Sequence, residues 1–320
     1  MDKERFIQAL EENSMELLKH IPKSDLHSHA GRGGSVSYIE DYANVKIAPP
    51  SEPFNSLSDM NQWLNDHVKI HCPSGLSGYL KRVEAAYAQA KEDGISALAL
   101  SYAMDEVDAF GSVQHFISVM DGLHAKFAPD TACFPDLALG YSPDVAYELE
   151  RLDDVLSARW FAGIDICNYA GRHTMKTLRR ITEKAQQADV VCKAHIGEFG
   201  GCEDVLRYAN ELQLDQIQHG IAAADSPYVM RYLSDHGIQL NVCPTSNILL
   251  KNSKSYQSHQ IRTLYDHGVL VTINTDDLLI FNSSVSQEYL KLFQAGLMTA
   301  EELNTIRKTG LGYPRRRKAE

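Results

Sequence analysis

The sequence predicts an α/β fold, a (β/α)8 TIM barrel with a helical insertion between its first and second strands. Two observations support this prediction. In the second half of the chain, short β-branched or apolar runs alternate with longer amphipathic runs, which is typical of βαβ units around a parallel sheet. An early strand, expected at residues 23–29, brings the number of expected strands to eight, the number in a closed (β/α)8 barrel. The expected strands are residues 23–29, 95–103, 133–140, 160–166, 190–195, 217–219, 238–243 and 269–275.

Helices are expected between these strands. The insertion covers roughly residues 36–92. His236 and His267 each precede a glycine that suits the left-handed residue ending a helix, so we interpret both as helix caps rather than ligands. No Ser/Gly-rich linker divides the chain, so we expect one domain over residues 1–320. The other candidate helices are residues 113–127, 174–188, 203–212 and 227–236.

The composition argues against several classes of partner. The chain of 320 residues has 31 Lys and Arg against 42 Asp and Glu, a formal net charge of −11. Nucleic acids and anionic membranes favour an excess of basic residues, so we expect a small-molecule substrate instead. No run approaches the ~18 apolar residues of a membrane span, and the charged N-terminal segment is unlike a signal peptide. The six cysteines are scattered, so we expect reduced thiols and a cytoplasmic protein.

Histidines lie at the ends of several predicted strands. In His27-Ser28-His29, the alternation of a strand places both imidazoles on one face, which makes half of a metal site; the alternative is a hydrogen-bonded pair. His195 ends the fifth strand, and Glu198 follows three residues later, as a proton shuttle over the site or as a solvated loop acid. His219 ends the sixth strand, and alone it could equally be bonded to a neighbouring group.

Two adjacent carboxylates, Asp276 and Asp277, end the eighth predicted strand. An acidic pair at this place is costly unless the charges are paired or bind a metal, although one of the two could cap a helix. Neighbouring residues of an ideal strand point to opposite faces. Both carboxylates can therefore serve one site only if the chain leaves strand geometry there.

These groups together end the first, fifth, sixth and eighth predicted strands. In barrel enzymes the active site lies at the C-terminal ends of the strands. Three histidines and one carboxylate form a nitrogen and oxygen donor set that suits Zn2+, with a water in the remaining position. The sequence therefore predicts a zinc site at this end of the barrel.

The order of the motifs is informative beyond their positions. His-x-His, then His-x-Gly-Glu, then His-Gly and then Thr-Asp-Asp closely resembles the adenosine deaminase family of the amidohydrolase superfamily. The resemblance extends to CPTSN at residues 243–247 and to the stretch from 274 to 310, so it spans most of the chain. It implies one zinc ion per chain and hydrolytic deamination of adenosine or a related 6-aminopurine or amino-heterocycle. The zinc ligands that it implies are His27, His29, His195 and Asp276.

The resemblance also implies roles for the neighbouring residues. Glu198 is the acid–base residue, His219 orients the metal-bound water, and Asp277 is the hydrogen-bond partner of a substrate ring nitrogen, at the place of purine N7. Zn2+ lowers the pKa of bound water to roughly 7, which supplies hydroxide near neutral pH. Hydroxide adds to the amino-bearing carbon while Glu198 protonates the adjacent ring nitrogen, and ammonia leaves after a further proton transfer.

The sequence departs from the family at two positions that concern the substrate. Adenosine-acting members usually have an acidic residue after His-x-His, where this chain has Gly31 followed by Arg32. After the fourth strand the family commonly has Asp-Leu-Ala-Gly, and here Asn168 replaces the glycine. We therefore expect adenosine to be a poorer substrate than another 6-aminopurine-like compound. The loop at 31–35 could present amides and Arg32 to an anionic group, or it could be a flexible lid with Arg32 in solvent.

Two other functions fit parts of this pattern. One is another amidohydrolase reaction, on an amide, ester or phosphoester. Two-metal enzymes of that kind typically bridge their metals with a modified lysine on the fourth strand, and residues 160–166 contain no lysine. The other is a non-catalytic zinc-binding barrel used as a scaffold, which predicts loss of the groups at Glu198 or His219, yet both positions are filled.

Overall fold

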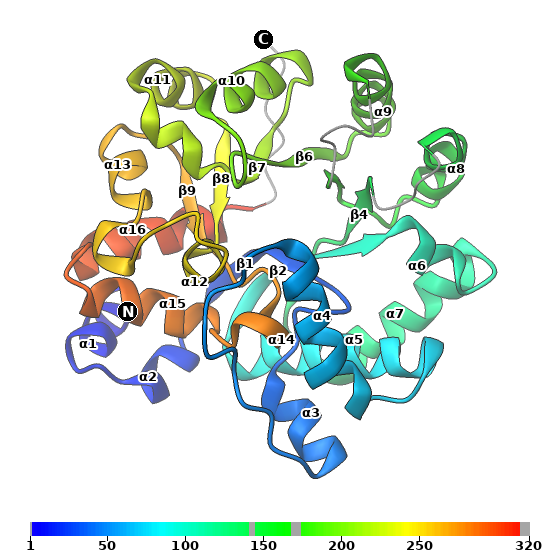
Figure 1. Cartoon of the computed structure of the whole chain (residues 1–320), viewed down its shortest axis with the longest axis horizontal. Helices are drawn as coiled ribbons and strands as arrows, with labels where there is room; N and C mark the ends of the chain where they lie inside the picture. The colour runs from blue at the N-terminus through cyan, green and yellow to red at the C-terminus, as the bar shows by residue number, and fades with distance from the viewer. Residues whose placement is uncertain (1, 141–144, 168–173, 314–320) are drawn as a thin grey trace.

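The barrel expected from the sequence is present in the computed structural model, which describes residues 2–140, 145–167 and 174–313. The parallel strands neighbour one another in the order β1-β2-β4-β5-β6-β7-β8-β9, and a short strand, β3, pairs with β2 beside this path. Figure 1 shows the strands at the centre with helices around them. The strands are β1 (Lys23–His29), β2 (Ile95–Ala103), β3 (Ala132–Cys133), β4 (Asp136–Leu139), β5 (Gly163–Ile166), β6 (Val191–Ile196), β7 (Gln216–His219), β8 (Gln239–Val242) and β9 (Val271–Ile273).

Helices separate the strands along the chain. The segment between β1 and β2 holds α3 (Val36–Ala43), α4 (Leu57–His67), the 3-10 helix η1 (Lys69–His71) and α5 (Gly75–Glu92). Both α3 and α4 contact α14 (Leu278–Phe281), the short helix after β9, so they lie near the end of the barrel where the strands finish. The other helices are α1 (Asp2–Glu11), α2 (Met15–Lys19), α6 (Met104–Asp108), α7 (Val113–Phe127), α8 (Val145–Ser157), α9 (Met175–Gln187), α10 (Cys202–Glu211), η2 (Ile221–Asp225), α11 (Pro227–Asp235), α12 (Pro244–Leu249), η3 (Tyr256–Ser258), α13 (Ile261–Asp266), α15 (Val285–Gln294) and α16 (Ala300–Leu311).

The seam between β1 and β9 is joined by a few specific contacts. Ser28 and Asp276 form an isolated parallel bridge, and the Asp276 amide donates to the His27 carbonyl oxygen at 2.9 Å. The buried carboxylate of Asp25 accepts from the Thr275 amide at 3.2 Å and from its hydroxyl at 2.5 Å. Helix α16 packs against both strands. These contacts place the end of β1 next to the residues that follow β9.

Polar and apolar side chains alternate along the strands. On β6, Cys192 and Ala194 belong to the apolar core, whereas Lys193 and His195 alternate with them. Lys193 donates to the Asp136 carboxylate at 2.6 Å, a contact between two fully buried residues of β6 and β4. Asn241 of β8 likewise donates to side chains of β7 at 2.9 Å. Part of the barrel interior is therefore polar, and these side chains are hydrogen-bonded between neighbouring or nearby strands.

Several of the expected strands differ in extent from the structure, and the run at 160–166 is shortened to β5. The run at 133–140 is divided into β3 and β4, because Pro135 has no amide hydrogen for the ladder. The last strand ends at Ile273, and Asp276 has a left-handed backbone with φ of 62°. The prediction that His236 and His267 cap helices is confirmed: each follows the last residue of its helix, and its Nδ1 lies 2.8 Å from a carbonyl oxygen one turn earlier.

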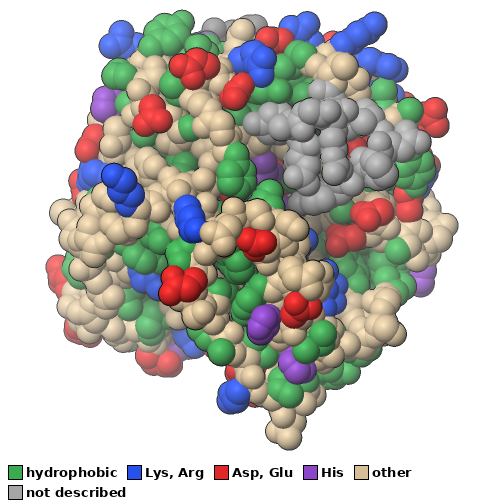
Figure 2. Space-filling view, in the orientation of Figure 1, with side chains coloured by type: hydrophobic (Ala, Val, Ile, Leu, Met, Phe, Trp, Pro, Cys, Tyr) green, Lys and Arg blue, Asp and Glu red, His purple; other side chains and the backbone are tan. Residues whose placement is uncertain are grey.

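The surface carries charged side chains of both signs, as the composition of the sequence requires. Acidic and basic side chains are interspersed over the face shown in Figure 2. Among the described residues, no helix is long and apolar enough to cross a bilayer.

Candidate metal and active site

The histidines predicted as metal ligands converge where the barrel strands end. His27 and His29 lie on β1, and His195 lies on β6. One ring nitrogen from each of the three lies within 4.8 Å of the other two. The Nε2 atoms of His27 and His195 are 3.0 Å apart. The barrel therefore gathers at one point donors from distant parts of the chain.

The carboxylate of Asp276 completes this donor set, which we call the ligand cluster: His27, His29, His195 and Asp276. Its Oδ1 lies 3.7 Å from Nε2 of His27 and 3.4 Å from Nε2 of His29. The left-handed backbone of Asp276 breaks the strand alternation, so that Asp277 also lies within 4.8 Å of His29 and Asp276. The sequence indicated that the chain must leave strand geometry here if both carboxylates are to serve one site, and the backbone of Asp276 does so.

Hydrogen bonds on the far sides of two rings decide which nitrogen faces the site. Nδ1 of His27 lies 3.2 Å from the Asn241 carbonyl oxygen, and Nδ1 of His195 lies 3.0 Å from a carboxylate oxygen of Asp165. A proton on each Nδ1 leaves a lone pair on each Nε2. The two Nε2 atoms lie 3.0 Å apart, so a proton or a metal ion must bridge them. Imidazole nitrogens and a carboxylate oriented in this way fit a Zn2+ ion.

The cluster keeps its carboxylates ionised although they are buried. Burial acts to raise the pKa of Asp276, but its hydrogen bond to His29 and the nearby His27 lower that pKa below its usual range. The pKa of Asp165 is lowered in the same way by His195, against the effect of burial. Burial lowers the pKa of His27, which favours the neutral ring that a metal bond requires, whereas neighbouring carboxylates raise the pKa of His29 and of His195 against the effect of burial.

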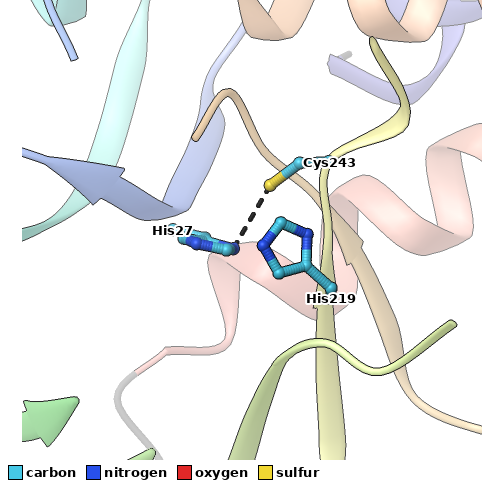
Figure 3. A group of neighbouring side chains, drawn as sticks. All are labelled: His27, His219 and Cys243. Carbon is cyan, nitrogen blue, oxygen red and sulfur yellow. Dashed lines mark hydrogen bonds between the residues drawn. The ribbon is translucent and has the colours of Figure 1, made fainter. Parts of the chain in front are cut away.

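Glu198 and His219 lie beside the ligand cluster. Nε2 of His219 is 3.6 Å from Oε2 of Glu198 and 3.9 Å from Oδ2 of Asp276. Figure 3 shows the His219 ring close to that of His27, and the ring centroids are 4.5 Å apart. The Asn247 side-chain nitrogen donates to Nδ1 of His219 at 3.1 Å, which leaves the proton of the neutral ring on Nε2. His219 therefore directs an N–H group toward the two carboxyl groups.

The buried surroundings set the protonation of these two groups. Burial, together with the negative charge of Asp276, raises the pKa of Glu198 to about 8. A carboxyl group with this pKa holds a proton near neutral pH and can donate it. Burial lowers the pKa of His219 to about 3, so its imidazole is neutral. The pair therefore offers one transferable proton and one fixed hydrogen-bond donor.

The sequence reasoning missed the residues that hold the ligand cluster in place. Asp165 fixes His195, and its signal was an acidic residue inside an otherwise apolar strand, which requires a partner. The hydroxyl of Ser246 donates to Oδ2 of Asp276 at 2.6 Å. Ser246 and Asn247 belong to the CPTSN segment, which was recognised without a role for each residue. Figure 3 also shows the Cys243 sulfur beside His27, 3.2 Å from Nδ1.

The loop after β1 is tightly folded. The amides of Arg32 and Gly33 donate to the His29 carbonyl oxygen at 2.8 and 2.6 Å. A Cβ at Gly33 would lie 2.1 Å from the Ser28 hydroxyl, so a side chain there would require Ser28 to move. Nη1 of Arg32 donates to Oδ2 of Asp277 at 2.9 Å. In the structure these two amides are used within the loop, and one nitrogen of Arg32 is bonded to Asp277.

Three predicted substrate-binding residues remain. Oδ1 of Asp277 is buried and accepts no hydrogen bond from the described residues, which leaves it available within the site. Gly31 precedes Arg32 and lines the same cavity as His29. Asn168 lies outside the described residues.

Comparisons with known proteins bear on the family and the fold. A family model described as adenosine deaminase matches residues 139–313, more than half of the chain. A putative adenosine/adenine deaminase of Treponema pallidum is 25% identical over 301 residues, which cover 92% of this chain and 99% of that protein. An adenine deaminase structure from Arthrobacter aurescens superposes with a TM-score of 0.72 at 18% identity, covering 91% of this chain and 93% of that chain. An amidohydrolase structure from Burkholderia ambifaria with bound zinc has a TM-score of 0.71 at 17% identity, covering 92% of this chain and 86% of that chain.

Proposed function

Because this chain belongs to the adenosine deaminase family, we propose that it is a zinc-dependent hydrolase that releases ammonia from a 6-aminopurine. The observation that carries the proposal is the convergence of His27, His29 and His195 on one point, with Asp276 3.4 Å from His29 and with Glu198 and His219 close to Asp276. We propose one zinc ion per chain, held by the four residues of that cluster. The zinc in the Burkholderia ambifaria structure, which has the same fold, supports this choice of metal.

In the proposed reaction the metal would supply the nucleophile, and side chains of the protein transfer the proton and stabilise the developing charge. When bound, Zn2+ would lower the pKa of a coordinated water to about 7 and so supply a nucleophile near neutral pH. Glu198 donates its proton to the ring nitrogen next to the amino-bearing carbon, which makes that carbon more electrophilic. His219 directs its Nε2–H at the attacking oxygen and stabilises the charge that develops there. General acid–base assistance of this kind contributes about 10²–10⁴-fold to the rate.

Asp277 and Arg32 position the substrate ring in this proposal. The free Oδ1 of Asp277 marks the carboxyl group as the hydrogen-bond partner of a ring nitrogen, at the place of purine N7. Arg32 holds the other oxygen of the same group at 2.9 Å, which fixes its orientation. Arg32 therefore acts on the substrate through Asp277.

Among 6-aminopurines, we propose that adenine is a better substrate than adenosine. Gly31 provides no side chain to bond a sugar hydroxyl, and a Cβ there would already lie 3.0 Å from the ring of Tyr79. A site that lacks the polar partner of a hydroxyl loses its preference for the compound that carries it. The bond between Arg32 and Asp277 also favours a neutral ligand over an anionic one.

Steady-state ammonia release by the zinc-loaded chain tests this function. Adenine should give a kcat/KM in the ordinary enzyme range, about 10⁴–10⁸ M⁻¹s⁻¹, with lower values for adenosine and AMP. Release from adenosine that exceeds release from every other aminopurine would contradict the ranking. Hydrolysis of amides or esters without ammonia release from any aminopurine would favour the other amidohydrolase reactions. A chain that binds zinc but hydrolyses none of the aminopurines, amides or esters would be a non-catalytic scaffold.

A further inference from the structure

The space beside Gly31 is already occupied by two residues from other elements. A Cβ at residue 31 would lie 3.0 and 3.2 Å from two ring carbons of Tyr79 and 3.4 Å from Oε1 of Glu106. Tyr79 belongs to α5, and Glu106 belongs to α6, the short helix that directly follows β2. A longer side chain at residue 31 would collide with Tyr79. A carboxylate from another element lies next to the point where that side chain would begin.

Glu106 is held in one orientation by two donors. Its Oε2 accepts from the Ala103 amide at 2.9 Å and from the Tyr79 hydroxyl at 3.1 Å. The first of these bonds satisfies the backbone at the start of α6, as in a capping box. No described residue donates a hydrogen bond to the other oxygen, Oε1. Glu106 therefore presents a fixed acceptor with unused capacity.

This acceptor lies on the wall of a cavity next to the ligand cluster. The cavity has a volume of about 180 Å³, and its wall includes Glu106, Gly31, Arg32 and His29. Arg82 donates to the Gly31 carbonyl oxygen at 2.9 Å and fixes that part of the wall. A molecule bound in this cavity would contact both His29 of the ligand cluster and the carboxylate of Glu106.

We propose that Glu106 is a specificity-determining residue, whose Oε1 accepts a hydrogen bond from an N–H or O–H group on the part of the substrate away from the reacting carbon. This inference rests on the proposed function and names the contact that selects the substrate. The donor that agrees with adenine as the preferred substrate is the ring N–H of a free base; a hydroxyl of a nucleoside sugar would make the same contact and is the other outcome that the test distinguishes. Tyr79 is the positioning residue that keeps Glu106 in place.

Substrate pairs that differ by one donor test the inference in the zinc-loaded full chain. Adenine and 9-methyladenine differ by the ring N–H, and adenosine differs from its 2′-, 3′- and 5′-deoxy forms by one hydroxyl each. The wild type should prefer the donor-bearing member of one pair by about tenfold or more in kcat/KM. In Glu106→Gln this preference should fall below about twofold. The Ala103 amide and the Tyr79 hydroxyl are both donors, so the oxygen of the new side-chain amide must face them. The amide NH2 then faces the cavity in place of the acceptor.

Matched variants separate this contact from a general effect on folding. Asp130→Asn removes a charge from an exposed residue outside this cavity and should keep the wild-type preference. Tyr79→Phe keeps the ring but removes one of the two bonds to Glu106, and it should weaken the preference by about threefold. Zinc content and melting temperature near those of the wild type establish that each variant is folded. Tyr79→Phe also provides the test if Glu106→Gln does not fold.

The outcomes distinguish this inference from the function on which it rests. A preference for adenine over 9-methyladenine identifies a ring N–H as the donor, whereas a preference for adenosine over one of its deoxy forms identifies a hydroxyl. Either preference supports the inference if Glu106→Gln removes that preference. A preference that Glu106→Gln leaves unchanged, or no preference in the wild type, overturns the inference while the proposed function stands. No ammonia release from any of these substrates overturns the proposed function, and the inference with it.

Discussion

His195 and Arg32 lie at the same site, but they are held in different ways. His195 comes from a barrel strand and is fixed at 3.0 Å by Asp165 of the neighbouring strand. Arg32 comes from the loop after β1, and its partner Asp277 follows the last strand. The ligand cluster therefore depends on the barrel itself. The cavity wall formed by Gly31, Arg32 and Glu106, which we call the substrate wall, depends instead on contacts among loops and helices. Such a division allows the substrate to change while the chemistry is kept.

Removing one member of the ligand cluster should have the largest effect. In His195→Ala, the remaining ligands lose a nitrogen that lies 3.0 Å from Nε2 of His27, so zinc content should fall from about one per chain to near zero, and activity with it. His236→Ala removes an exposed helix-cap histidine and should leave the zinc content unchanged. Elemental analysis after dialysis measures both variants. One full equivalent of zinc in His195→Ala would exclude that residue from the ligand set.

Glu198→Gln should separate metal binding from turnover. The amide keeps the shape of the side chain but cannot donate the carboxyl proton, so kcat should fall by about 10²–10⁴-fold while zinc remains bound. Glu203→Gln, at an exposed position of α10 a few residues later, should retain wild-type turnover. Initial rates of ammonia release with saturating substrate provide the comparison. A near-normal kcat in Glu198→Gln would exclude Glu198 from proton transfer.

Arg32→Ala should have a smaller effect, confined to substrate binding. The side chain is 29% exposed and its partner Asp277 is 4% exposed, so loss of the ion pair should raise KM for neutral aminopurines by about tenfold with little change in kcat. Arg207→Ala, which removes an exposed arginine on α10, should leave KM unchanged. Loss of AMP binding with adenine unaffected would instead support the anion-binding alternative for this loop.

Gly33→Ala should reduce stability through the tight loop after β1. Its Cβ would lie 2.1 Å from the Ser28 hydroxyl, and overpacking of this kind costs about 1–3 kcal/mol. Gly122→Ala is the matched control: the residue is exposed inside α7 with open space around it, and the change should stabilise the fold by about 0.5–1 kcal/mol. Urea unfolding measures both free energies. Equal stability of Gly33→Ala and the wild type would show that the loop can rearrange.

The sequence was most informative about the ligand cluster. Strand ends are recognisable from the local alternation of side chains, and in a parallel barrel all of them lie at one end. His27, His195 and Asp276 could therefore be assigned to one site from their places in the predicted strands. The left-handed backbone of Asp276 could not be foreseen, because it depends on the join between the first and last strands.

The substrate wall shows where such reasoning ends. The replacement of an expected acidic residue by Gly31 was visible in the sequence. That Tyr79 and Glu106 occupy the adjacent space was not, because they belong to two helices with no local pattern that relates them to the loop after β1. The partner of Arg32 was missed for the same reason, since it lies 245 residues away. Contacts between separate elements are set by tertiary packing, which one sequence does not display.

A zinc titration of the metal-free chain tests the central claim most directly. The metal is removed with a chelator, zinc is returned in steps, and ammonia release from adenine is measured at each step. The account predicts that the rate rises linearly and reaches a plateau at about one equivalent per chain, since the proposed ligand cluster would hold a single ion. A plateau at two equivalents, or full activity without metal, would contradict it.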